Sequence, residues 1–379
     1  MANTIPSALI TALYAGMDHV SREMVGFIPA VTLDPSAARA AVNQVVYSAV
    51  TPQATASDVT PGVTPPDDGD QTLGSTSITI TKSRRVAIRW NGEQSRAMDN
   101  GPGRQAIQAN QVTQAIRTLI NEMEADLAGL YKTASRAYGT AGTTPFGTVG
   151  DFSDIAQMRK ILADNGADMG DIQLILNTAA GAVFRGKQSQ AQISGDANFQ
   201  RNGVLLDMHG FALRESAQVK THTKGTGSSY QSNNAAGYSA GATSIALDTG
   251  SGTVLAGDVL SFTGDANKYV TASALSGGSL IIGAPGLQTA LADNVAMTVG
   301  NSYAANMAFS RSAIILATRA PALPVEGDSA VDRMQITDPL SGITLEVSMY
   351  LQYKQVQYEI AAAWGVANAK PEWTGILLG

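Results

Sequence analysis

The sequence predicts a mixed α+β fold organised around one long helix. Between Arg104 and Tyr138 there is no proline and only one glycine, and apolar residues recur at helical spacing. Strand-like alternation of period two precedes this helix at 78–90 and returns near the end of the chain at 343–364. A third region, 217–302, is rich in glycine and holds short β-type runs. Together these patterns indicate an α+β chain with a separate β module.

The composition limits what the chain can do. Of 379 residues, 44% are hydrophobic, and only 15% are charged, against about 25% in an average globular chain. The shortage of charge suggests that partners cover much of the surface. The net charge of −6 argues against binding DNA by neutralising phosphates. The absence of cysteine excludes disulfides and thiolate chemistry, and fits a reducing cytoplasm.

The first part of the chain is predicted to form an arm and a projecting hairpin. Residues 3–24 fit an amphipathic helix without the features of a signal peptide, and no run is long and apolar enough to span a membrane. Residues 51–74 combine prolines with threonine, aspartate and glycine, a composition that cannot build a core. We expect 43–92 to form one long hairpin with a flexible tip at 51–74.

The helix predicted at 104–138 would be about 50 Å long at 1.5 Å per residue, much longer than an average helix. Such a helix usually serves as a structural spine. Further elements are expected after it: helices at 153–165 and 178–190, strands at 172–176 and 204–213, and helical patterning at 304–318.

Within 217–302, turn residues separate short β-type runs every 8–12 residues or so, which is typical of a small barrel or sandwich. The runs are Ser244–Leu247, Asp258–Phe262, Tyr269–Thr271, Leu280–Ile282 and Ala296–Val299. After the turn at 338–342, two long alternating arms predict an antiparallel hairpin.

Motifs that could carry enzymatic chemistry are weak. Residues 237–241 match G-x-S-x-G around Ser239, but a polar loop precedes them and every histidine lies upstream. Residues 181–188 resemble a phosphate-binding loop, but Gln188 replaces the hydroxyl that would hold Mg²⁺ after Lys187. His19 and Glu23 supply only two potential metal ligands. We therefore expect no enzyme, no cofactor and no metal.

Two charged clusters on the predicted hairpin are candidate subunit contacts. The acidic cluster can also be read as a solvated loop or as an incomplete Ca²⁺ site, since Ile78 stands where a closing glutamate would be needed. Individually weak pairs, repeated in many copies, would suit an assembly that must correct its errors. The candidate residues are Asp67, Asp68, Asp70, Lys82, Arg84, Arg85 and Arg89.

The order of elements resembles that of the major capsid proteins of tailed bacteriophages, over nearly the whole chain. Residues 79–90 look like the strand that returns from the extended loop of that family, and 306–319 resemble the stretch where its axial domain resumes. Residues 338–342, 364–366 and 371–373 are similar to its closing strands. The insertion at 217–302 looks like the extra β-barrel domain of the short-tailed-phage coat protein group.

The resemblance implies a division of the chain into an N-terminal arm, an extended loop, a spine-helix peripheral domain, an axial domain and an inserted β-barrel. The expected boundaries are 1–42 (arm), 43–98 (extended loop), 99–165 (spine helix and start of the peripheral domain), 166–216 (peripheral and axial α/β domain), 217–302 (inserted barrel), 303–330 (axial domain continued) and 331–379 (peripheral strands).

The resemblance also implies partners. These are further copies in hexamers and pentamers, a scaffolding protein, a portal, decoration proteins, and packaged DNA held without sequence specificity; no membrane is implied. Assembly would take place in the host cytoplasm, and the product would be the icosahedral shell of the virion. Another phage structural role or a carbohydrate-binding adhesin remains an open alternative, as does an enzyme using Ser239 or Lys187.

Overall fold

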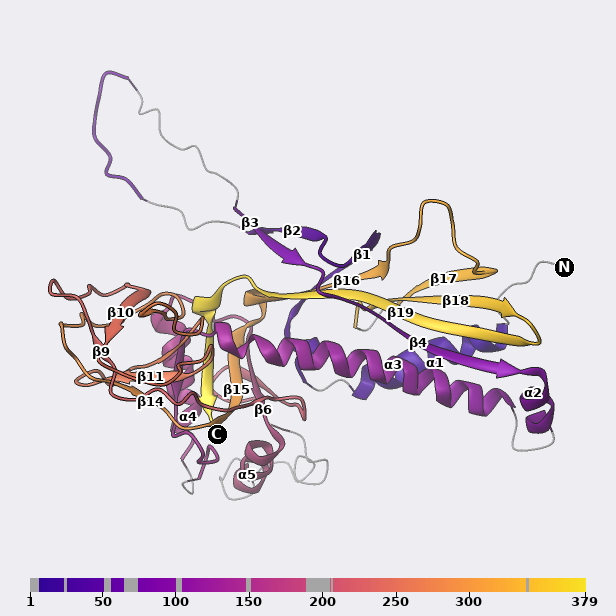
Figure 1. Ribbon diagram of the computed structural model, residues 1–379, viewed down its shortest axis with the longest axis horizontal. Helices are drawn as coiled ribbons and strands as arrows, with labels where there is room; N and C mark the ends of the chain where they lie inside the picture. Colours follow the sequence, from indigo (N-terminus) through magenta and orange to yellow (C-terminus); the bar gives the residue numbers. More distant parts are fainter. Residues whose placement is uncertain are drawn as a thin grey trace.

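The computed structural model describes residues 7–23, 26–50, 56–64, 74–99, 104–147, 151–188, 205, 207–338 and 341–379. The chain forms an α+β structure, as predicted. An elongated helix-and-sheet body occupies one half, and a rounded β module lies at the opposite end (Figure 1).

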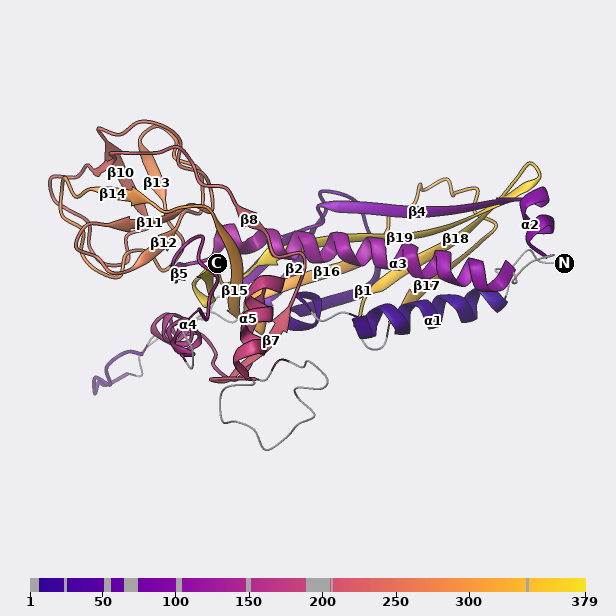
Figure 2. The same ribbon diagram turned by 90° about the horizontal axis from the view of Figure 1, so that it is seen from below.

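Two helices cover one face of a six-stranded sheet. Helix α3 (Arg104–Ala128) runs along the sheet, and α1 (Ser7–Glu23) lies beside α3 (Figure 2). Helix α1 buries the side chains that recur at its helical period: Leu9, Leu13, Met17 and Val20. A Cβ added to Gly16 would lie 3.0 Å from the hydroxyl oxygen of Thr113, so this glycine allows the two helices to approach closely.

The six-stranded sheet is mainly antiparallel. The long strand β19 pairs with β4 on one side and with β16 and β18 on the other, while β17 pairs with β18 and β1 pairs in parallel with β16. The strands are β1 (Thr32–Ala40), β4 (Lys82–Asn91), β16 (Ile314–Pro321), β17 (Asp332–Thr337), β18 (Thr344–Gln352) and β19 (Gln355–Asn368). The hairpin predicted at 343–364 is confirmed as β18–β19.

A nine-stranded sheet forms the other half and is continuous with the β module. Its order is β14-β11-β12-β5-β20-β15-β6-β7, with β8 also pairing β15. Its strands are β5 (Arg136–Tyr138), β6 (Ile172–Leu176), β7 (Phe211–Glu215), β8 (Thr221–His222), β11 (Val259–Phe262), β12 (Lys268–Val270), β14 (Met297–Val299), β15 (Tyr303–Ser310) and β20 (Thr374–Leu378). Helices α4 (Ser153–Asp164) and α5 (Thr178–Gln188) pack on it, as predicted.

The β module has its own apolar core, which includes Ile245, Leu260 and Tyr269. A small sheet of β9 (Gln231–Ser232), β10 (Ser244–Asp248) and β13 (Ser279–Ile281) faces the end of the nine-stranded sheet. The five β-type runs predicted here are all strands. Because β12 pairs with β5, the module shares main-chain hydrogen bonds with the body.

The spine helix is shorter than predicted. It ends at Ala128, about 37 Å from its start at 1.5 Å per residue, and a tight 3₁₀ turn follows at Gly129–Thr133 before strand β5. The pattern overran because Leu130 and Tyr131 keep the helical spacing although they lie in the 3₁₀ turn, where Tyr131 is buried. Other short elements are α2 (Gly92–Asp99) and the 3₁₀ turns Ile28–Ala30, Arg311–Ala313 and Pro371–Trp373.

The helix predicted at 304–318 is wrong: this stretch is β15, a 3₁₀ turn and β16. Both strands are central in their sheets and are buried on both faces, so they lack the alternation that identifies a half-buried strand. Of the strand predicted at 204–213, the described residues are in a strand from Phe211; residues 204 and 206 lie outside the described residues.

The single hairpin predicted at 43–92 is also corrected. Strand β2 (Val45–Val50) pairs with β3 (Gly74–Thr79), and this two-stranded ribbon projects from the body (Figure 1). Strand β4 turns away from the ribbon and pairs with β19. The sequence pattern did not separate them because β3 and β4 are adjacent and keep the same alternation.

Candidate subunit-contact surfaces

The basic candidates Lys82, Arg84, Arg85 and Arg89 all lie on β4, on the body and not on the projecting ribbon. Successive side chains of a strand point to opposite faces of the sheet. The even-numbered side chains therefore face α3, and the odd-numbered ones face away from it. This separation decides which partner each basic residue finds.

Lys82 belongs to the internal framework of the body. Its Nζ lies 2.7 Å from Oδ1 of Asp126 on α3, and the other carboxylate oxygen of Asp126 accepts a hydrogen bond of 2.9 Å from Nε1 of Trp364. Trp364 is fully buried on β19. One carboxylate thus ties the spine to two neighbouring strands, so Lys82 is already occupied within its own chain.

Two further basic residues also have partners in the chain. Arg84 lies 3.5 Å from Glu122 of α3, and both side chains are well exposed. Arg85 bonds to Glu359 on the opposite face at 2.5 Å, and this bond is the main cause that raises the pKa of its guanidinium. Arg89 is exposed, and no ion pair joins it to any described residue.

The acidic candidates Asp67, Asp68 and Asp70 lie outside the described residues. The basic cluster is carried by the body, and its predicted pairing with the acidic cluster stays a prediction. Asp58 lies in the described part of the loop and is exposed.

The ribbon leaves apolar side chains in water. Val59 and Val63, in the loop between β2 and β3, are 97% and 105% exposed, and Tyr47 on β2 is 71% exposed. Of the described residues of this segment, those at the base of the ribbon are anchored, where Ile78 and Ile80 pack against Ile315 and Ala363. The loop therefore projects apolar groups that its own chain does not cover.

A second exposed surface lies at the far end of the body, where β18 turns into β19. Tyr353 is 86% exposed there, and Leu351 is half exposed. Both line a groove of about 990 Å³ together with Leu9 of α1 and Trp90 of β4. Sequence reasoning missed this surface, although the pair Tyr353-Lys354 between two alternating arms marks a turn that must be exposed.

The segment that follows α1 is hydrogen-bonded to the spine helix α3 through one buried carboxylate. Glu124, on α3, accepts hydrogen bonds from the backbone N–H groups of Phe27 and Ile28 at 3.0 and 2.8 Å, and from the hydroxyl of Ser216 at 3.1 Å. Two carboxylate oxygens therefore satisfy three donors from two distant segments.

The end of the spine joins the β module through a buried polar cluster. His222 is 4% exposed and Asp258 1%. Nε2 of His222 lies 2.8 Å from Asp258, and Nδ1 lies 2.9 Å from the hydroxyl of Tyr131. Asp258 also accepts from the backbone N–H groups of Gly225 and Leu255. Burial raises the pKa of the Tyr131 phenol, which stays a neutral hydrogen-bonding group here.

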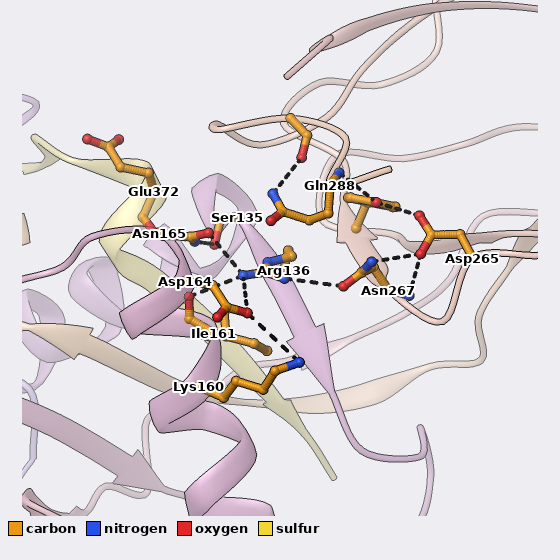
Figure 3. A network of polar contacts seen from close by, with 12 residues as sticks. Ser135, Arg136, Lys160, Ile161, Asp164, Asn165, Asp265, Asn267, Gln288 and Glu372 are labelled. Atoms are coloured by element: carbon orange, nitrogen blue, oxygen red, sulfur yellow. Dashed lines mark hydrogen bonds and ion pairs between the residues drawn. The ribbon is translucent and has the colours of Figure 1, made fainter. Parts of the chain in front are cut away.

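A second polar network joins the same two regions, centred on Arg136 of β5 (Figure 3). Its guanidinium, which is buried, donates to the carbonyl of Ile161 and to Oδ1 of Asn165 in the α4 region, and to Oδ1 of Asn267 in the module. Asp164 lies 3.5 Å away. The module is thus fixed to both the spine end and α4.

The described residues of the weak enzymatic motifs do not adopt the geometry that the corresponding active sites require. Ser239 lies on an exposed turn, and residues 181–188 are part of helix α5, so they form no loop that could cradle phosphate. His19 is exposed on α1, and the side chain of Glu23 lies outside the described residues. Over the described ranges there is no cluster of three or more metal-ligating side chains, and no helix long and apolar enough to cross a membrane.

No family model matches the sequence, and no curated protein matches it. Among solved structures, the chain is similar to one in the capsid structure of cyanophage P-SCSP1u, with 10% identity and a TM-score of 0.47, over 92% of this chain and 86% of that chain. A chain from Mycobacterium phage Che8 is 12% identical, with a TM-score of 0.43 over 88% of this chain and 84% of that one.

A virus-like particle from Pyrococcus furiosus is similar over 98% of both chains, at 8% identity and a TM-score of 0.43. These similarities concern the path of the backbone. The function of this chain is therefore argued from its own residues.

Proposed function

We propose that the chain is the major capsid protein of a tailed bacteriophage, a structural subunit that assembles with copies of itself into an icosahedral shell. The observation that carries this proposal is the projecting ribbon, whose loop holds Val59 and Val63 fully in water. Burying one such side chain is worth about 1.5 kcal/mol or more. Covering the ribbon with a neighbouring copy would recover that free energy once for every subunit.

The arrangement favours head-to-tail contacts. The ribbon and the surface around Tyr353 differ in composition and lie on different parts of the molecule (Figure 1). A contact that joins two different patches repeats around a ring, and a ring closes when the rotation between copies permits it. We propose that such rings are hexamers and pentamers, that a scaffolding protein, a portal, decoration proteins and non-specifically packaged DNA are further partners, and that assembly takes place in the host cytoplasm.

The acidic residues Asp67, Asp68 and Asp70 remain proposed contacts for basic residues of a neighbour. Lys82, Arg84 and Arg85 already have partners in their own chain, whereas Arg89 has no ion pair with a described residue. Exposed pairs of this kind contribute about 0–1 kcal/mol each, so they would adjust the register of a contact that apolar burial drives.

The test is assembly of the purified chain, alone and with its scaffold, followed by negative-stain microscopy and sedimentation. We expect uniform shells or tubes of subunits. The double variant Val59→Ser with Val63→Ser should keep the thermal stability of the subunit, because both side chains are already in water, and should lose most assembly. Ser239→Ala is the matched control on another exposed loop and should assemble normally. A chain that stays monomeric under all conditions would overturn the proposal.

A further inference from the structure

Strand β4 is an open edge of the six-stranded sheet. It pairs with β19 over all ten residues from Lys82 to Asn91, and in the described part of the chain no strand pairs with its other side. Figure 2 shows β4 at the margin of the body, with α3 beside it. In an antiparallel strand alternate residues turn their N–H and C=O groups outward, so β4 presents a row of unpaired main-chain groups.

Most devices that protect sheet edges are missing from β4. The strand contains no proline, and its register with β19 is continuous, so no bulge turns the edge away. At ten residues it is longer than an average strand. Ala87, in its middle, is exposed. In the described part of the chain, charged side chains are therefore what protects this edge from pairing with other strands. They also determine which partner can bind to it.

A groove of about 470 Å³ runs between this edge and the spine helix. Its apolar lining comes from Val86, Ile88 and Ile107. The wall formed by α3 carries side chains that both donate and accept hydrogen bonds: Asn110, Gln111, Gln114 and Thr118. Such a wall suits a segment of extended chain lying between the strand and the helix.

The charge at the groove is basic. Arg89 lines it, is exposed and has no ion pair with a described residue. From this juxtaposition of an open edge, a polar groove and an exposed guanidinium group, we propose that β4 and α3 form a docking site for an extended acidic segment of a partner protein. The segment adds to the sheet as a further strand, with its carboxylates on the face of Arg89 and its apolar side chains on the face of α3.

The loop of a second copy of this chain fits the site less well. Pro61 interrupts its described part, and Pro65 and Pro66 follow in the sequence. Each proline removes a main-chain donor and cannot take part in a continuous ladder. The occupant is therefore a proline-free segment with acidic and β-branched residues in alternation, and the site does not depend on the shell proposed above.

The test uses the full-length unassembled chain and an end-blocked octapeptide that alternates glutamate and valine. Fluorescence anisotropy should show saturable binding. Two further probes carry N-methyl groups on alternate residues, one set on each edge of the peptide. Because only one edge can pair with β4, one set should abolish binding and the other should leave it unchanged. Equal binding of both methylated probes would overturn the strand-addition model without altering the protein.

The charge requirement is tested by Arg89→Gln. Losing one exposed charge contact should weaken binding of the glutamate–valine peptide about threefold. Arg96→Gln, an exposed change on the neighbouring α2, should leave affinity unaltered, and a lysine–valine peptide should not bind. Affinity weaker than about 1 mM for the acidic peptide would reject the site. Binding to the free chain that disappears in assembled particles would assign the groove to a second copy and reject a separate partner.

Discussion

The two parts of the spine helix are fixed by different chemistry. Along its middle, α3 packs apolar side chains such as Ile116, Leu119 and Met123 against α1 and the six-stranded sheet. At its end, the turn after α3 meets the β module through the buried hydrogen bonds of Tyr131, His222 and Asp258. Apolar packing is non-directional, whereas a buried polar network is satisfied in one geometry only. The body can therefore adjust, while the module is held in one orientation.

Beyond its base, the described part of the ribbon β2–β3 has neither apolar packing nor buried hydrogen bonds to the rest of the chain. Its apolar side chains point into water, and the β4 edge beside the body has unpaired main-chain groups. The molecule thus combines a firmly hydrogen-bonded joint, an apolar body and surfaces that only another molecule completes. Substitutions in each of these three regions should change the free energy of unfolding by different amounts, and this tests the comparison.

The largest effect is expected at the module joint. Asp258→Ala would leave His222 and two backbone N–H groups buried without an acceptor, at a cost of about 3–5 kcal/mol in the free energy of unfolding. Differential scanning calorimetry would measure it. Tyr131→Phe removes only one hydroxyl of the same cluster and should cost about 1 kcal/mol. If the two variants cost the same, the joint is not organised around Asp258.

A smaller loss is expected where the N-terminal segment meets the spine. Glu124→Ala would remove the acceptor for Phe27, Ile28 and Ser216 and cost about 2–3 kcal/mol. Hydrogen exchange should rise at the amides of Phe27 and Ile28. Glu122→Ala, one half-turn earlier on the exposed side of α3, should change stability by less than about 0.5 kcal/mol. Unchanged exchange at Phe27 in the Glu124 variant would contradict this anchor.

The contact between spine and sheet should be more tolerant. Asp126→Asn weakens the pair with Lys82 but still offers an oxygen to Nε1 of Trp364, so we expect a loss of about 1 kcal/mol. A double-mutant cycle with Lys82→Met would isolate the coupling. Strictly additive effects of the two changes would mean that the ion pair contributes nothing to stability.

The last prediction concerns stability at high pH. Burial, together with the hydrogen bond to Asp265, raises the pKa of Tyr269 in the module core to about 12. Since an unfolded tyrosine titrates near pH 10, the stabilisation is complete below about pH 10 and is lost as the pH rises through about 12. The phenolate absorbance of wild type minus Tyr269→Phe should follow this pKa. A difference spectrum that titrates near pH 10 would refute it.

The sequence by itself determined the elements whose patterns are local. Proline-free helical periodicity located α3, the alternation of 343–364 located β18 and β19, and glycine-bounded runs located the module strands, because each pattern reports a single buried face. The tertiary structure decided the rest. Residues 304–318 form strands because neighbouring elements cover both of their faces. Strand β4 lies outside the predicted hairpin because it pairs with β19 over ten residues.

The same division holds for the candidate contacts. Composition and charge located Lys82, Arg84, Arg85 and Arg89, but their partners Asp126, Glu122 and Glu359 are distant in sequence. The sequence likewise did not predict the contact between His222 and Asp258. Which charges meet, and which strand edge stays open, depends on contacts between segments far apart in the chain, and a one-dimensional pattern does not encode those distances.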